Sequence, residues 1–447
     1  MITRCFTQHS VAFKIWDVIT EPNILNSMWQ KMERIRRLKN PVQKYAWGSP
    51  TAIPRLLGQD NPDNEPWAEL WIGAHPKAPS LAATEKGWES LQTVIQKDPV
   101  GMLGQRVSRQ FGGRLPFLFK VLAAAAPLSI QAHPNKIQAE KGFAEENRLG
   151  IPMDAPNRNY RDDNHKPECI CAVEPFLALC GFRRVPDILA YMEPLRIEEL
   201  AAPLSILRQH PNRNGLGGFY QALMTLSPGV RRRLVSKAVE GSEKLAGEDP
   251  AYGWVIRLDA AYPEDIGALS PLMLNLVRLE PGQALFLPAG ELHAYLEGVG
   301  IELMANSDNV LRGGLTPKHV DASELMSVLN FEQRDIRILS PRIVSAVENV
   351  YPTPAGEFQL SVIHLSAKDG ESTFKSEGLQ ILLCVEGGAT FTSPGQEGEL
   401  KVEKGEAMLV PADVDAYRIR GHADFYKASI PRNADDPDGA GLPLEPS

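Results

Sequence analysis

The chain has 447 residues, and its 47 Lys and Arg against 55 Asp and Glu give a net charge of −8. With 43% hydrophobic and 23% charged residues it has ordinary globular composition, which excludes disorder of the whole chain. A mildly acidic chain without a basic block is a poor candidate for nucleic-acid binding. No apolar run reaches the ~18 residues of a membrane helix. We therefore expect neither nucleic-acid nor membrane partners.

Residues 1–36 are weakly patterned and lack the apolar core of a secretory signal. We interpret them as an extension that is either disordered or, with a later start of translation, not part of the protein. The five cysteines are an odd number and include no Cys-x-x-Cys pair, which fits buried thiols in a reducing compartment. We therefore expect a cytoplasmic protein.

From residue 37 the sequence predicts short strands separated by turn residues. The clearest strand candidates span 116–122, 128–133 and 168–173. Between 183 and 265, apolar residues recur at spacings of three and four, which predicts helices. The glycines of 215–218 lack the strand-then-helix setting of a dinucleotide loop, so we interpret them as a helix break.

Strand patterns resume at 272–278 and 284–287 and fill the region from 335 onward. The final residues are rich in Asp, Pro and Gly, which predicts a disordered tail. The predicted fold is mainly β, with two β units and an inserted helical domain. The predicted boundaries are 37–182 plus 266–334 for the first unit, 183–265 for the helical insert, 335–432 for the second unit and 433–447 for the tail.

Two segments of the sequence share the same spacing of glycine and proline around a strand pattern. Gly282 lies six residues before Pro288, and a buried strand followed by Pro-Ala-Gly leads to His293. The segment from Gly405 repeats this spacing but carries Ala416 where the first copy has histidine. Both resemble the second motif of the cupins, which implies two jelly-roll units. Only the first unit could hold a metal in this way, so we interpret the second as structural.

Four residues could form that metal site. Gln131 and His133 are two apart, so on a strand they share a face. Glu168 begins another strand candidate, and His293 begins a third. An amide oxygen, two imidazoles and a carboxylate suit a borderline divalent cation such as Zn²⁺. A satisfied structural histidine is the alternative for His133.

Five motifs occur in one order and together resemble the type I mannose-6-phosphate isomerases, from about Leu38 to Arg432. They are Pro41–Gly48, Glu69–Pro76, Ser129–Pro134, His165–Glu168 and Leu311–Val320. The resemblance implies one Zn²⁺ per chain, held by Gln131, His133, Glu168 and His293. It also implies reversible isomerisation of mannose 6-phosphate to fructose 6-phosphate through an enediol or enediolate.

The same resemblance assigns an active-site role to Arg312 and phosphate contacts to Ser129 and Lys318. Further positions that it implies in the pocket are Trp47, His165, Lys166, Tyr295, Glu302 and Asp308. The proton-transferring acid and base remain open among His165, Lys166, Glu302 and Asp308. Lys120 lies inside an apolar strand, so it is either paired or directed toward the pocket as a substrate-binding residue.

We expect a monomer whose partner is a small sugar phosphate. A cupin oxygenase is one alternative, because two histidines and one carboxylate also bind Fe(II). Gln131 as a fourth ligand, with Ser129, Arg312 and Lys318 for an anionic sugar, argues against it. A sugar-phosphate sensor without turnover is the second alternative, and the complete acid, base and metal set argues against that.

Overall fold

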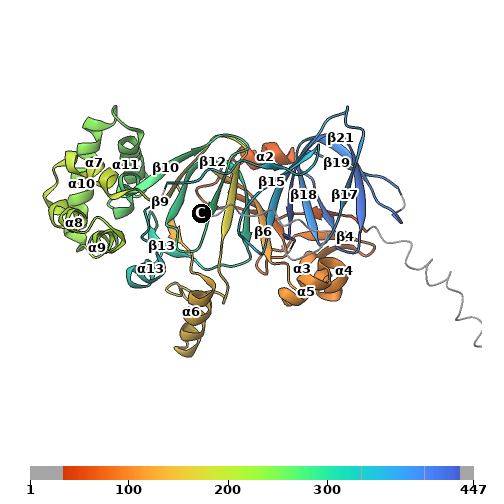
Figure 1. Cartoon of the computed structure of the whole chain (residues 1–447), viewed down its shortest axis with the longest axis horizontal. Coiled ribbons are helices and arrows are strands. Elements are labelled where there is room, and N and C mark those ends of the chain that lie inside the picture. Colours follow the sequence, from red (N-terminus) through yellow and green to blue (C-terminus); the bar gives the residue numbers. More distant parts are fainter. Residues whose placement is uncertain (1–33, 334, 397, 433–447) are drawn as a thin grey trace, which may run out of the picture.

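The computed structural model describes residues 34–333, 335–396 and 398–432. Most of the predicted extension and all of the predicted tail lie outside the described residues. The molecule is strand-rich, with two antiparallel sheets and a group of helices at one end (Figure 1). This confirms the predicted fold class.

The first sheet is built around its longest strand, β12, which pairs with β6, β7, β8 and β9. Its strands are β2 (Val42–Gln43), β3 (Glu69–Gly73), β6 (Phe117–Ala124), β7 (Ile130–Ala132), β8 (Glu168–Ala172), β9 (Phe176–Phe182), β10 (Leu274–Leu279), β11 (Ala284–Leu287), β12 (His293–Ala305) and β13 (Leu311–Gly314). All eight residues of β6 and all five of β8 are buried. Continuous apolar strands such as these are typical of sheets covered on both faces.

The second sheet follows the order β14-β15-β16-β21-β18-β20-β1-β4-β5, with β17 and β19 paired at its side. Its strands are β1 (Arg36–Lys39), β4 (Leu81–Thr84), β5 (Gly87–Ser90), β14 (Arg342–Ile343), β15 (Glu348–Tyr351), β16 (Gln359–Leu365), β17 (Glu371–Lys375), β18 (Gln380–Thr392), β19 (Leu400–Glu403), β20 (Ala407–Val410) and β21 (Ala416–Ser429). Three of these strands come from residues 36–90, so hydrogen bonds cross the predicted boundary between the units. The division into units remains a prediction.

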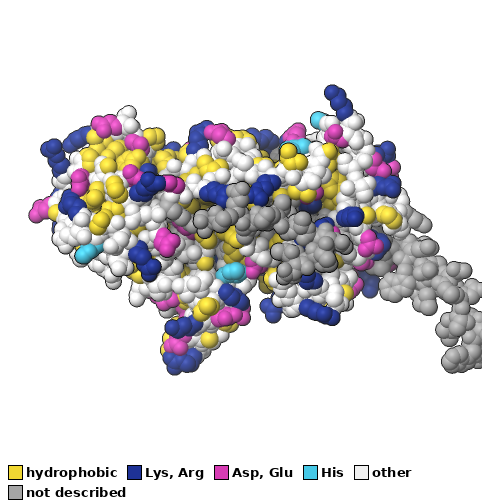
Figure 2. Space-filling view, in the orientation of Figure 1, with side chains coloured by type: hydrophobic (Ala, Val, Ile, Leu, Met, Phe, Trp, Pro, Cys, Tyr) yellow, Lys and Arg dark blue, Asp and Glu magenta, His cyan; other side chains and the backbone are white. Residues whose placement is uncertain are grey.

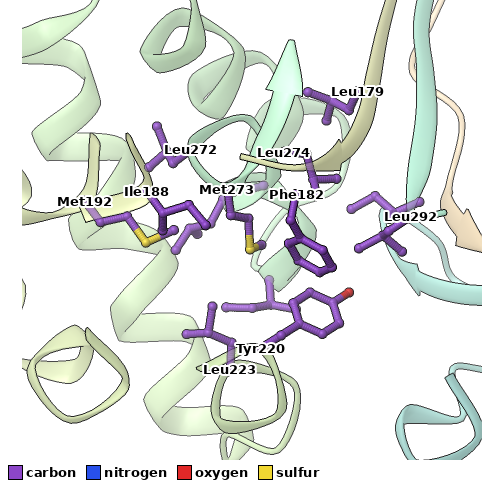
Figure 3. Close-up of a cluster of buried hydrophobic side chains, with 14 of the residues drawn as sticks. Leu179, Phe182, Ile188, Met192, Tyr220, Leu223, Leu272, Met273, Leu274 and Leu292 are labelled. Atoms are coloured by element: carbon purple, nitrogen blue, oxygen red, sulfur yellow. The ribbon is translucent and has the colours of Figure 1, made fainter. Parts of the chain in front are cut away.

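Helices cover the far end of the first sheet and flank the second. They are α2 (Ala52–Leu57), α3 (Leu91–Lys97), α4 (Pro99–Leu103), α5 (Gln105–Gln110), α6 (Lys136–Arg148), α7 (Val185–Met192), α8 (Glu198–Gln209), α9 (Arg213–Met224), α10 (Pro228–Leu245), α11 (Pro250–Ala261), α12 (Ser270–Met273) and α13 (Ala322–Val328). Figure 3 shows Ile188 and Met192 of α7 and Tyr220 of α9 packed with Phe182 of β9. This shared core fixes the helical insert to the sheet.

The helix break is not at Gly215–Gly218, as the sequence suggested, because these glycines lie inside α9. The break precedes them at His210–Asn212, where the Asn212 side chain accepts hydrogen bonds from the first backbone amides of α9. A Cβ atom at Gly215 would lie 1.8 Å from the His210 carbonyl oxygen. The glycine therefore permits the close turn between α8 and α9.

The two sheets share one apolar core. Phe119 and Ile301 of the first sheet belong to the same buried cluster as Leu360 and Ile381 of the second. Between them the Cys171 thiol lies 3.2 Å from the Tyr351 hydroxyl, which donates to the Gly282 carbonyl at 2.8 Å. Burial of this kind holds the two sheets in a fixed relation.

Basic and acidic side chains are intermixed on the face shown in Figure 2, and α6 carries both signs where it projects from the body. Within the described part of the chain, no helix is long and apolar enough to cross a membrane.

Candidate metal centre and active site

Three strands of the first sheet bring His133, Glu168 and His293 together. Glu168 begins β8, His293 begins β12, and His133 follows β7. Each is about 1% exposed. The Nε2 atoms of His133 and His293 lie 3.4 Å and 3.3 Å from the two carboxylate oxygens of Glu168. Across the described ranges, this is the one group of three or more His, Cys, Asp and Glu side chains with metal-binding geometry.

The hydrogen bonding around these side chains fits a divalent cation. The Nδ1 atom of His133 contacts the Asn309 carbonyl at 2.7 Å, and that of His293 contacts the Glu291 carbonyl at 2.9 Å. Carbonyl acceptors fix the Nδ1–H tautomer and leave Nε2 free as a ligand. Both Nε2 atoms and one Glu168 oxygen are buried without a hydrogen-bond partner. Since buried polar atoms are almost always paired, this convergence is best explained by a metal.

The electrostatics keep the ligands in their metal-binding protonation states. Burial, reinforced by the nearby Lys166 ammonium, lowers the pKa of His133 to about 4, so its imidazole is neutral at pH 7. Burial alone would raise the pKa of Glu168, but Lys166 and His133 hold it well below its usual value. The Lys166 Nζ lies 2.7 Å from Glu168 Oε1. A neutral imidazole and an ionised carboxylate are the forms that bind metal.

Strand register places Gln131 and Arg312 beside this centre. Gln131 pairs directly with His293 on one side and with Arg312 on the other. Residues directly opposite each other in an antiparallel pair share a face of the sheet. The three positions therefore form one row, and Gln131 as a fourth ligand remains a prediction that the register supports.

Glu302, Lys120 and Tyr295 form a buried network of their own. Lys120 Nζ lies 2.9 Å from Glu302 Oε2 and 3.4 Å from Glu69 Oε1. The Tyr295 hydroxyl donates to Glu302 Oε1 at 2.9 Å. Burial would lower the pKa of Lys120, but Glu302 and Glu69 raise it above its ordinary value. Lys120 is thus paired with carboxylates, which is one of the two alternatives that the sequence left open for it.

Asp308 is held by two basic partners that sequence reasoning missed. Its Oδ1 lies 3.5 Å from His75 Nε2, and its Oδ2 lies 2.9 Å from Lys77 Nζ. Burial opposes ionisation, but these contacts bring the pKa of Asp308 far below its usual value. Asp308 is therefore a permanent anion at neutral pH.

His165 receives its partner from the second sheet. Its Nε2 lies 2.6 Å from Oε1 of Glu357, a residue on the segment between β15 and β16. Burial would raise the pKa of Glu357, but the His165 contact lowers it. A carboxylate that contacts an imidazole in this way fixes its orientation. No sequence motif pointed to Glu357, because it lies almost 200 residues away in the second unit.

Cations gather around Arg312. Burial and then the Arg161 guanidinium lower the pKa of Arg312. Burial, then Arg312, Arg161 and Lys77 lower the pKa of Lys318. The Arg161 guanidinium donates to the Ala155 carbonyl at 3.2 Å and also to the Met153 carbonyl. Part of the pKa shift of Arg312 and of Lys318 thus comes from neighbouring positive charges. Arg161 was missed, although it lies only four residues before His165.

Asn309 holds the metal ligand His133 in place through its backbone carbonyl, and the sequence did not identify it. It is fully buried, its side-chain amide donates to the Asn164 carbonyl at 2.8 Å, and its Oδ1 accepts from the Arg161 backbone amide at 2.6 Å. Its own carbonyl contacts His133. One residue therefore ties the segment before Glu168 to a metal ligand.

Ser129 and Trp47 lie at the edge of this group. Ser129 directly precedes β7 and is partly buried. Trp47 packs against the buried cluster that contains Tyr295, and its ring stacks on Tyr45 with centroids 5.7 Å apart. Tyr295 itself is 2% exposed, so a substrate contact would require it to be uncovered.

Comparisons with known proteins agree with this geometry. Residues 35–185 match the family described as phosphomannose isomerase type I, catalytic domain, and residues 348–429 match the mannose-6-phosphate isomerase cupin domain. The Escherichia coli mannose-6-phosphate isomerase is 43% identical over 392 residues, covering 87% of this chain and 97% of the relative. The human enzyme is 32% identical, covering 85% and 94%. A zinc-bound mannose 6-phosphate isomerase structure superposes with a TM-score of 0.82 at 40% identity, covering 89% and 100%.

Proposed function

The chain belongs to the type I phosphomannose isomerases, and we propose that it performs their reaction at the buried centre of its first sheet. It interconverts mannose 6-phosphate and fructose 6-phosphate and depends on zinc. The observation that carries this is the trio of buried, unpartnered ligand atoms on His133, Glu168 and His293.

Zinc bound here supplies a positive charge that polarises sugar oxygens and stabilises negative charge as it develops on them. His133, Glu168 and His293 would hold it, with Gln131 as the fourth ligand. Because Lys166 contacts Glu168, it fixes the carboxylate while remaining within reach of a sugar bound at the metal.

The isomerisation moves two protons. The open-chain aldose loses a proton from C2, and its C1 oxygen gains negative charge. The hydroxyl proton of the C2 oxygen then passes to the C1 oxygen, and reprotonation at C1 gives the ketose. Arg312 lies in the row that continues through Gln131 to His293, so its guanidinium can donate two hydrogen bonds to the adjacent oxygens of the enediolate. Stabilisation of such an oxyanion is often the largest single contribution of an enzyme.

We assign the proton transfer to His165. Glu302 lies between Lys120 and Tyr295, and Asp308 lies between His75 and Lys77. His165 is oriented by a carboxylate through Nε2, and its side chain is 28% exposed. An imidazole held in this way can take a proton at C2 and return it at C1.

The substrate phosphate is a dianion that needs fixed cations. Lys318 and Arg161, close to Arg312, supply them, and Ser129 at the start of β7 supplies a hydroxyl. Because neighbouring positive charges disfavour the protonated forms of Arg312 and Lys318, a bound anion beside them is favoured. This arrangement distinguishes a phosphorylated sugar from a neutral one.

The deciding experiment measures turnover of mannose 6-phosphate to fructose 6-phosphate before chelation, after chelation and with zinc restored. We expect turnover to disappear with the chelator and to return with zinc. A folded, zinc-loaded protein without turnover would contradict the proposal and favour a sensor. Oxygen-dependent activity that requires iron would instead favour the oxygenase.

We also propose a cytoplasmic monomer. Cys169, Cys171 and Cys384 are buried thiols outside any disulfide, which supports a reducing compartment. Sedimentation equilibrium of the purified chain tests the monomer, and fractionation of cells tests the compartment.

A further inference from the structure

The second sheet borders a cavity that the isomerase reaction does not use. Its volume is about 820 Å³, and its walls come from β15, β16, β17, β18 and β21, the segment 352–356 and residues 429–432. None of the residues assigned to the metal or the sugar phosphate lines it. These strands lie in the sheet at the opposite end of the molecule from the helical insert (Figure 1).

A buried ion pair forms part of the wall. Lys427 of β21 and Glu348 of β15 lie with Nζ 2.6 Å from Oε1, and their side chains are 9% and 12% exposed. Burying an ion pair has a desolvation cost. Apolar residues of similar size in the same place often give the protein equal stability. An ammonium has three donors and a carboxylate several acceptor sites, so one mutual contact leaves both with unused hydrogen-bonding capacity. The pair therefore presents a donor beside an acceptor.

The surroundings of the pair are polar on one side and aromatic on the other. Gln380 is buried, and its side chain accepts from the Tyr417 hydroxyl at 2.7 Å. Ser361 faces Lys427 in the strand register, and its buried hydroxyl has no partner. The Phe374 ring lines the cavity with its centroid 5.9 Å from Lys427 Nζ. Polar groups beside an aromatic face are the usual lining of a small-molecule site.

We propose that this cavity is a second binding site, for a neutral, hydroxyl-rich molecule of the size of a monosaccharide. Vicinal hydroxyls both donate and accept, so they match a lysine and a glutamate placed side by side. The C–H face of a sugar ring matches Phe374. A strongly anionic ligand would meet Glu348 and Glu377, and a cationic ligand would meet Lys427, Lys375 and Arg432, which is paired with Glu377. The opposed charges of this wall thus favour a neutral ligand, whereas the cations around Arg312 favour an anion.

The test uses the full-length, zinc-loaded protein and ligand-observed NMR with two neutral hexoses, D-mannose and D-glucose. Saturating mannose 6-phosphate is present throughout to occupy the metal centre. We expect saturation transfer to at least one hexose, and we expect Lys427→Met and Glu348→Gln each to weaken its binding at least tenfold. Lys368→Met, on the loop between β16 and β17 and outside the cavity, is the matched control and should bind as the parent chain does.

Thr373→Trp provides an independent test if removal of the buried charges impairs folding. Thr373 is an exposed wall residue, so a large ring there fills the cavity without breaking the ion pair. Loss of hexose binding in a folded Thr373→Trp protein would support the site. Absence of hexose binding in the parent chain, displacement by the sugar phosphate, or unchanged binding in Thr373→Trp would each overturn the proposal.

Discussion

The two β units place different residues at corresponding positions. In the first, the strand after the Pro-containing turn begins with buried His293, which points at Glu168. In the second, the corresponding strand begins with Ala416. The interior of the first unit carries the metal-binding group His133, Glu168 and His293. Each unit has a buried lysine–glutamate pair, but the second is otherwise packed largely with apolar side chains such as Phe391 and Phe425.

The turns show what the two units have in common. Gly282 and Gly405 have φ angles of +85° and +86°, a left-handed conformation that glycine adopts without strain. The next turn differs, because Gly290 is also left-handed and a Cβ there would lie 2.7 Å from the Val328 carbonyl oxygen, whereas Asp413 occupies its place in the second unit. Turn chemistry therefore builds both strands, and the residue at the strand start is a metal ligand only in the first unit, where His133 and Glu168 accompany it.

Removing a metal ligand should have the largest effect on activity, because the ligands are what distinguish the first unit from the second. We expect His293→Ala to lower kcat/KM at least ~10³-fold, because the metal contributes several kcal/mol of charge stabilisation. Zinc content, measured by atomic emission, should fall with the activity. His364→Ala changes an exposed histidine of the second unit and serves as the control, with zinc and activity retained. Full zinc occupancy in His293→Ala would contradict the ligand assignment.

Loss of Arg312 should have the next largest effect. Arg312→Ala removes a donor from the developing oxyanion, so we expect kcat to fall about 10²- to 10³-fold with zinc content unchanged. Arg312→Lys keeps the charge but loses the paired geometry and should recover only part of the rate. Arg420→Ala, an exposed arginine of the second unit paired with Glu399, is the control. Equal rates for Arg312→Ala and the parent chain would exclude Arg312 from catalysis.

A smaller effect on activity is expected at Glu357, the residue of the second unit that contacts His165 of the first. Glu357→Gln keeps the shape but removes the charge beside His165, so we expect kcat to fall about tenfold with little change in KM. Glu371→Gln, an exposed carboxylate of β17, is the control. A kcat equal to that of the parent chain would contradict a role of Glu357 in positioning His165 for proton transfer.

Local pattern and motif predicted much of this architecture. The strand candidates at 116–122 and 168–173 correspond to β6 and β8, because continuous apolar runs between prolines suit a strand buried on both faces. The segment 284–287 matches β11 at both ends. The helix break was misplaced because Asn212, not the glycines after it, starts α9.

The parts of the site that sequence did not predict depend on long-range contacts. His133, Glu168 and His293 could be named because each lies at a strand end within a motif. Glu357 could not, because its relation to His165 exists only after the second sheet packs on the first. Hydrogen bonds between distant segments leave no periodicity in the chain. Arg161 lies four residues before the recognised motif that begins at His165, but no spacing or residue pattern marked it as part of the site.

The smallest expected effect comes from restoring histidine in the second unit. Ala416→His recreates the spacing of the first copy, yet Ala416 pairs with Lys375, and no metal-binding cluster of His, Cys, Asp and Glu surrounds it among the described residues. One imidazole without a carboxylate or a second imidazole binds zinc poorly. We therefore expect one zinc per chain and unchanged isomerase activity, measured by atomic emission and turnover. A second tightly bound zinc would show that the strand start alone determines the difference between the units, without the partner ligands supplied by β7 and β8.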